Sequence, residues 1–315
     1  MATKKPTTNG KAKSTKSAAK PNNPTPPSGK PKGLSAMRHL QQVLSQQEFG
    51  SVTEVEAFLT DMESDDIPEF EPTKEEQQAE ELVMQGYDAP VPQAVELARR
   101  ALELDHECIS AFDLLGRCET MLAICAAYFK RGMDLGEERF DNDYRVRNEG
   151  HYWGLIETRP YLRCMAGYAD SCFYLGDVYQ AMDVWEDMLY LNSADNLGIR
   201  HHQLLCMAAL GEEDDFRKLD ALYADDAMAA TFYNRTLLAF TVKGPGPAAT
   251  KALQLAIRHN PHVAALLLQE EEPPALDGPY MLGSPEEALA YCERAWLVWT
   301  NIPKATQWLR SVVKA

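Results

Sequence analysis

The chain has 315 residues, of which 45% are hydrophobic and 25% are charged. It is therefore long enough to form one large domain or two ordinary ones with a buried core. No apolar run approaches the roughly 20 residues that cross a bilayer, and no apolar segment follows the basic N-terminus. Composition therefore argues against a membrane protein and against a secretory signal, and we expect a cytoplasmic protein.

Residues 1–33 differ from the rest in charge. They hold eight lysines and no Arg, Asp or Glu, so they carry +8, and the remaining residues carry −16 − 8 = −24. They have no aromatic residue and, after Met1, no aliphatic residue larger than alanine, so they predict a disordered lysine-rich tail. Four roles are possible for this tail: it solubilises the protein, makes a weak contact with nucleic acid, acts as a targeting peptide, or folds back on the acidic body.

Two short segments follow this tail. Residues 34–60 predict a short helical module, in which Ser51 and Glu54 form a capping box at the start of a second helix. Residues 61–73 are acidic and are interrupted by two prolines, which predicts a linker.

Residues 74–315 carry a repeat of paired positions seven residues apart, most of them occupied by small residues. The pairs are Ala94/Ala101, Tyr128/Leu135, Ala181/Met188, Phe216/Tyr223, Ala249/Ala256 and Ala288/Ala295. The steps between first members are 34, 53, 35, 33 and 39, and three of these lie within one residue of the tetratricopeptide period of 34. The two longer steps indicate insertions of 19 and 5 residues. We expect an all-α, tetratricopeptide-type solenoid of about six helical hairpins.

Glycines keep the same phase as the repeat. Gly176, Gly211 and Gly244 are separated by steps of 35 and 33, each just before an expected second helix. A left-handed residue commonly ends a helix at such a turn, and glycine adopts that conformation without strain. Gly116 lies where a first helix needs a small residue for close approach to its partner.

The sequence offers no pattern typical of catalysis or of metal binding. Its seven cysteines are odd in number and none is two residues from another, so we expect reduced, buried thiols and no zinc site. No glycine-rich phosphate loop is present, and His151 and Glu157 have no nucleophile beside them. We expect no enzyme activity, no cofactor and no metal.

The densest functional-looking cluster lies at the end of the longer insertion. It consists of His151, Trp153, Glu157, Arg159, Tyr161 and Arg163. One interpretation is a partner-binding pocket, in which the two arginines accept a carboxylate or phosphate and Trp153 or Tyr161 forms a flat wall. The other is a structural anchor, in which Glu157 pairs with an arginine and fixes the insertion to the solenoid.

Several runs resemble the suppressor of tumorigenicity seven family and its soluble tetratricopeptide relatives. They include Asn260–Val263, Gly283–Ala288 with Tyr291 and Trp299, the run GHYWGLIETRPYLR at 150–163, and Asp195-Asn196 with Gly198-Ile199-Arg200. The resemblance covers most of residues 39–310 and implies an interaction scaffold with no established reaction. It adds Asn196 and Arg200 to the candidate partner-binding residues. Animal members carry membrane segments that this chain lacks, so no membrane role is carried over.

Taken together, these patterns predict a non-catalytic scaffold whose groove binds a peptide or protein segment. Because the body is acidic, we expect that segment to be basic. The alternative is a nucleic-acid-associated factor in which the lysine-rich tail supplies the affinity.

Overall fold

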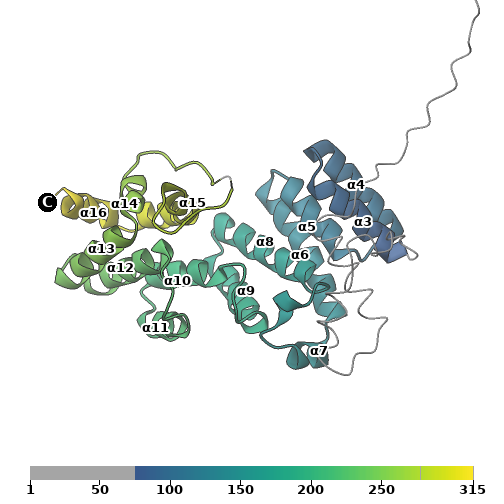
Figure 1. The fold of residues 1–315 in the computed structure, drawn as a ribbon, viewed down its shortest axis with the longest axis horizontal. Coiled ribbons are helices and arrows are strands. Elements are labelled where there is room, and N and C mark those ends of the chain that lie inside the picture. The colour runs from purple at the N-terminus through teal and green to yellow at the C-terminus, as the bar shows by residue number, and fades with distance from the viewer. Residues whose placement is uncertain (1–74, 277, 315) are drawn as a thin grey trace, which may run out of the picture. The chain divides into compact units, whose positions relative to one another are not determined.

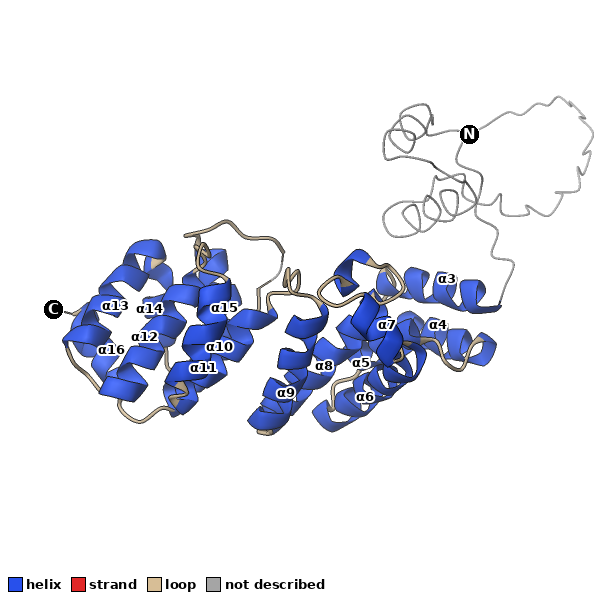
Figure 2. Ribbon diagram, turned by 90° about the horizontal axis from the view of Figure 1, so that it is seen from below, coloured by secondary structure: helices blue, strands red, loops and turns tan. Residues whose placement is uncertain are grey.

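The computed structural model describes residues 75–276 and 278–314, and within them it contains α-helices and no β-strand (Figures 1 and 2). The predicted tail, the module at 34–60 and the linker lie outside the described residues. The described elements are α3 (Glu75–Tyr87), α4 (Val91–Leu104), α5 (Ile109–Cys118), α6 (Leu122–Arg139), α7 (Asn142–Arg147), η1 (Tyr152–Gly154), α8 (Arg159–Leu175), α9 (Val178–Leu191), α10 (Ile199–Leu210), α11 (Glu213–Leu222), α12 (Ala229–Lys243), α13 (Pro247–His259), α14 (Pro261–Leu267), α15 (Pro285–Asn301) and α16 (Ala305–Val313).

Neighbouring helices pack as consecutive pairs. The contacting pairs are α3 with α4, α5 with α6, α8 with α9, α10 with α11, α12 with α13, and α14 with α15. Each of the six positions that open the sequence repeat lies in the second helix of one pair. Ten of the twelve repeat positions are buried, and only Tyr128 and Tyr223 are half-buried. The repeat therefore marks the residues through which each second helix packs.

The predicted glycine turns are confirmed. Gly176 ends α8 with φ 90°, Gly211 ends α10 with φ 75°, and Gly244 ends α12 with φ 71°. Residues with a Cβ adopt such positive φ values rarely. The chain therefore reverses at these points into α9, α11 and α13.

Glycine also permits close packing inside the helices. A Cβ at Gly116 would lie 2.5 Å from the Phe129 ring, as the expected close approach requires. A Cβ at Gly136 would lie 2.1 Å from the ring of Tyr161, a close approach that the repeat pattern does not predict. Both contacts join neighbouring helices, α5 to α6 and α6 to α8.

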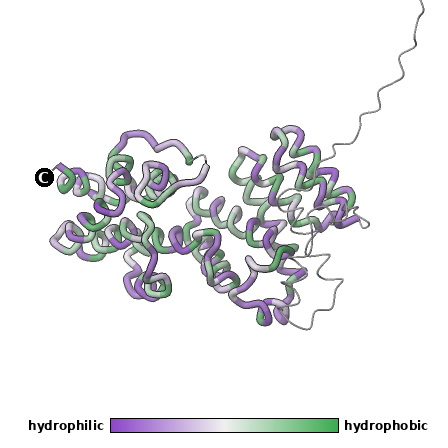
Figure 3. The backbone as a smooth tube through the Cα atoms, viewed as in Figure 1, coloured by the Kyte–Doolittle hydropathy of each residue, from purple (hydrophilic) through white to green (hydrophobic). Residues whose placement is uncertain are grey.

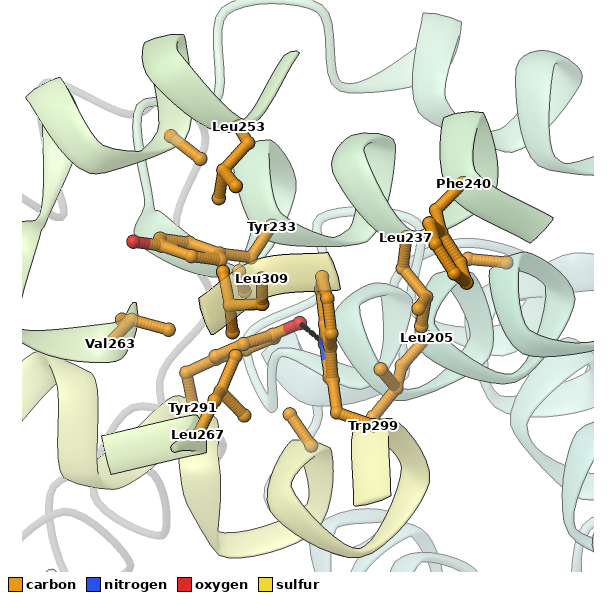
Figure 4. Close-up of a cluster of buried hydrophobic side chains, with 14 of the residues drawn as sticks. Leu205, Tyr233, Leu237, Phe240, Leu253, Val263, Leu267, Tyr291, Trp299 and Leu309 are labelled. Atoms are coloured by element: carbon orange, nitrogen blue, oxygen red, sulfur yellow. Dashed lines mark hydrogen bonds between the residues drawn. The ribbon is translucent and has the colours of Figure 1, made fainter. Parts of the chain in front are cut away.

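Among the described residues the buried apolar side chains form three clusters. Figure 3 shows hydrophobic and hydrophilic residues alternating along the helices. The largest is contributed by α10 and the helices after it. Figure 4 shows Tyr291 and Trp299 at its centre, where the indole Nε1 donates a hydrogen bond of 3.2 Å to the Tyr291 hydroxyl. Both side chains are buried, and this bond pairs the indole N–H with the tyrosine hydroxyl.

The longer insertion lies between α6 and α8 and contains α7 and η1. An aromatic cluster holds it, because Tyr144 and Tyr152 pack on Phe140 with ring centroids 5.0 and 6.1 Å away. Within 75–276 and 278–314, none of the helices combines the length and apolarity needed to cross a membrane.

Candidate functional site

The run GHYWGLIETRPYLR is partly buried. Tyr152, Thr158 and Tyr161 are fully buried. Thr158 immediately precedes α8, and its single hydroxyl proton is shared between the carbonyls of Tyr152 and Leu155, so the side chain does not cap the helix. Because Tyr161 has no exposed surface, it offers no wall to a ligand here.

Arg163 lies in a buried ion-pair network with Asp113 of α5. Its Nε donates to Asp113 Oδ2 at 2.8 Å, and Arg117 donates to the other carboxylate oxygen at 2.8 Å. The Tyr87 hydroxyl also donates to Asp113, at 2.5 Å. The Asp113 side chain is completely buried, so two guanidinium groups and a phenol balance one buried carboxylate. Arg163 therefore links three helices, α3, α5 and α8.

Arg159 faces a different partner. Its Nε donates to the Trp153 carbonyl at 2.9 Å, and its guanidinium lies 5.2 Å from the centroid of the Trp153 ring. Glu157 pairs with the Tyr144 hydroxyl at 3.2 Å and not with an arginine, which corrects the partner expected for it. His151 is exposed. The two arginines thus bind separate groups, and the cluster's role in partner binding stays a prediction.

Asn196 and Arg200 lie together at the start of α10. Asp195 accepts the backbone N–H groups of Ile199 and Arg200 at 2.7 and 3.0 Å. Arg200 spans Asp195 and Asp226, each at 2.8 Å, and its guanidinium lies 4.9 Å from the Tyr223 ring centroid. Asn196 is exposed. Burial raises the pKa of Asp195, against the hydrogen bonds from Arg200 that lower it.

A cavity of about 400 Å³ opens beside this helix start, between α10, α12, α15 and the loop before α15. Its polar lining is Asp195, Asn196, Arg200, His201, His202, Glu287 and Arg294. Its apolar lining is Leu197, Leu205, Met228, Ala230, Tyr280, Ala290 and Tyr291. Cavities of this size and mixed lining are typical ligand sites. Two residues of this lining, Leu205 and Tyr291, also belong to the core cluster that Figure 4 shows.

Both histidines at the cavity are neutral at physiological pH. Burial, assisted by the Arg200 guanidinium, lowers the pKa of His201 to about 4, although Asp226 acts in the opposite sense. Burial also lowers the pKa of His202 well below its usual value, with Arg294 and His201 adding to the shift. The His202 ring packs 5.6 Å from that of Trp185. A neutral imidazole offers one hydrogen-bond donor and one acceptor.

Glu287, which lines the cavity, accepts hydrogen bonds from three separate segments of the chain. Its Oε1 accepts the Ala229 N–H at 2.9 Å, at the start of α12. Its Oε2 accepts the Asn260 side chain at 2.9 Å and the Gly283 N–H at 2.6 Å. One buried carboxylate thereby joins α12, the α13–α14 junction and the loop before α15.

The loop before α15 reaches this cavity through Tyr280, and the two residues after it are also apolar and exposed. Tyr280, Met281 and Leu282 are consecutive, with 39%, 77% and 61% of their surface exposed. The exposed acidic residues Glu270–Glu272 lie at the start of the same loop. We call Tyr280, Met281 and Leu282 the rim.

Sequence reasoning missed most of this site. It gave no binding role to His201, His202, Tyr280, Glu287 or Arg294, all of which line the cavity. No local signal connects these residues, because they come together only when α15 packs against α10. Across the described ranges, no group of three or more His, Cys, Asp and Glu side chains is arranged to hold a metal ion.

No protein-family model matches the chain, and neither does any curated protein or solved structure.

Proposed function

We propose that this protein is a non-catalytic interaction scaffold, a tetratricopeptide-type stack of helical hairpins that binds a peptide or protein segment. The single observation that carries the proposal is the rim, where three consecutive apolar side chains are exposed beside a cavity. Contiguous exposed apolar surface on a folded protein typically marks an interaction site. The resemblance to the suppressor of tumorigenicity seven family supports the same assignment.

The expected segment carries basic residues next to an apolar one. An apolar side chain buries surface against Met281 and Leu282, while lysine or arginine faces Glu270–Glu272 of the same loop. The net charge of −24 on residues 34–315 favours such a segment at long range. The seven unpaired cysteines fit a reducing compartment, so the proposal places the protein in the cytoplasm.

The test is selection of binding peptides from a random displayed library on the full-length chain. We expect enriched peptides to combine an apolar anchor with flanking Lys or Arg. The double variant Met281→Ser, Leu282→Ser should lose them, whereas Leu222→Ser, which removes a 76% exposed leucine from the end of α11, should keep them. The proposal fails if no motif is enriched, or if the double variant retains the same peptides.

The lysine-rich segment supports a second proposal, a nucleic-acid contact. Eight lysines within residues 1–33 would supply affinity without reading sequence. The full-length chain should then bind DNA or RNA with an affinity that falls steeply between 50 and 200 mM salt. Replacing the eight lysines with glutamine should abolish that binding, and unchanged binding by this variant would exclude the tail as its source.

A further inference from the structure

The cavity holds polar groups of two kinds, and they differ in whether they are already paired. Two carboxylates, Asp195 and Glu287, and two guanidinium groups, Arg200 and Arg294, line it, so its formal charge is zero. Its preference for a ligand therefore depends on which of these groups still has hydrogen-bonding capacity.

The acceptors are occupied. Asp195 receives two backbone N–H groups and the Arg200 guanidinium. Glu287 receives three donors from neighbouring elements. The Arg200 guanidinium is itself divided between Asp195 and Asp226. None of these three side chains needs a ligand to complete its bonds.

Two donors are not occupied, one on Arg294 and one on the neutral His201 ring. Arg294 contacts Asp170 through one terminal nitrogen, and its buried Nε has no hydrogen-bond partner among the described residues. Neither ring nitrogen of the buried His201 makes a hydrogen bond there, although Nε2 lies 3.4 Å from an Asp226 oxygen without hydrogen-bond geometry. Buried donors left unpaired are costly, and each such group in a native structure calls for a partner.

The rest of the lining defines what surrounds that partner. Leu205, Met228 and Ala230 form an aliphatic wall, and Ala290 and Tyr291 close the α15 side. An acceptor group presented to Arg294 would therefore share the cavity with these apolar side chains.

We propose that this cavity binds a carboxylate carried on a compact apolar body. The carboxylate accepts from Arg294 and an imidazole of the histidine pair, and the apolar body packs on Leu205 and Met228. Planar recognition by arginine favours a carboxylate, and hydrogen bonds to charged groups are the stronger class. The inference concerns the cavity alone and does not depend on the protein partner proposed for the rim.

The test uses phenylacetate as the probe and phenylacetamide, of the same shape but uncharged, as its control, with binding to the full-length chain followed by NMR or calorimetry. We expect phenylacetate to bind at least about tenfold more tightly than the amide, since the amide loses the charge-assisted bonds. Ala290→Leu fills the cavity without removing a polar group and should abolish binding. Ala265→Leu, on the exposed face of α14, should leave it unchanged.

Arg294→Gln removes the charge and should reduce binding of phenylacetate to that of phenylacetamide. If Arg294→Gln unfolds the chain, His202→Gln serves in its place, because no ion pair holds His202 among the described residues. His202→Gln should weaken phenylacetate binding by severalfold. Equal affinity for the acid and the amide, or binding that survives Ala290→Leu, would overturn the proposal.

The source of the carboxylate is decided by a second pair of probes, a tripeptide ending in Phe with a free C-terminus and the same peptide amidated. Binding of phenylacetate with no binding of either tripeptide assigns a free organic acid. Binding of the free-terminus peptide as well assigns a chain end. No binding of either carboxylate probe refutes the cavity proposal, and it leaves the peptide selection at the rim as an independent result.

Discussion

The ion-pair network around Asp113 makes the sharpest stability prediction. Asp113→Asn keeps the side-chain volume but removes the negative charge between Arg163 and Arg117. It also places an amide N–H₂ close to arginine N–H groups, which can only donate. Breaking a completely buried pair typically costs 3–5 kcal/mol. Because Arg117 is 51% exposed and keeps much of its hydration, we expect a loss of about 3 kcal/mol in the free energy of unfolding.

The matched control is Asp215→Asn on α11. Asp215 also pairs with a basic side chain, Lys218 at 2.7 Å, but the two side chains are 61% and 77% exposed. Exposed pairs contribute little, so this change should stay within about 0.5 kcal/mol. Both variants carry the same chemical change and the same change in net charge.

The assay is urea unfolding at pH 7 followed by far-ultraviolet circular dichroism, with the free energy extrapolated linearly to water. A double-mutant cycle with Arg163→Gln then isolates the pair, and we expect a coupling energy above about 1.5 kcal/mol. If Asp113→Asn cost no more than Asp215→Asn, Arg163 would not be held by the buried carboxylate. The assignment of Arg163 as a link between α5 and α8 would then be refuted, and its role as a free ligand for a partner would regain support.

Three further predictions concern single positions. Between pH 6.5 and about 4 the unfolded chain protonates His201 while the folded chain does not, so acidification should lower the free energy of unfolding by up to about 3 kcal/mol through this group. In urea unfolding at pH 7.5 and 4.5, His201→Gln should lose less stability on acidification than the parent chain. Gly136→Ala should lower the free energy of unfolding by about 2 kcal/mol, because the new methyl group overpacks against an aromatic ring. Gly154→Ala, with no atom within 4 Å of the new Cβ, should be close to neutral, and thermal melts of the two variants test the difference. Glu287→Gln should cost about 2–3 kcal/mol, because the new amide group faces a backbone donor, and equal melting of variant and parent would contradict that role.

Periodicity predicted the helical pairs well, because it depends on contacts between neighbours in the chain. Ala94, Ala181, Ala249 and Ala288 each lie in a second helix and are buried, as the period indicated. In a stack of this kind each helical pair contacts mainly the pairs next to it, so a period in the sequence can reveal the pairing.

The same reasoning failed where the deciding contacts are long-range. Arg163 was placed beside Arg159 by helical spacing, yet its partner Asp113 lies 50 residues earlier in the chain. Arg294 and His202 line one cavity although they are far apart in sequence. A single sequence contains no signal for such pairs, since each residue taken alone looks like an ordinary surface charge or a helical histidine.

Insertions that interrupt a repeat are candidates for functional sites. The two insertions in this chain differ in whether their apolar side chains are buried. The 53-residue step produces α7 and η1, whose aromatic residues Tyr144 and Tyr152 turn inward onto Phe140. The 39-residue step falls in the region of the loop before α15, which leaves Met281 and Leu282 exposed beside a cavity. Both insertions contain several apolar residues, so the presence of apolar residues alone does not separate them. The difference is whether the apolar side chains find a partner within the chain, and those that do not are where a partner from outside has surface to bury.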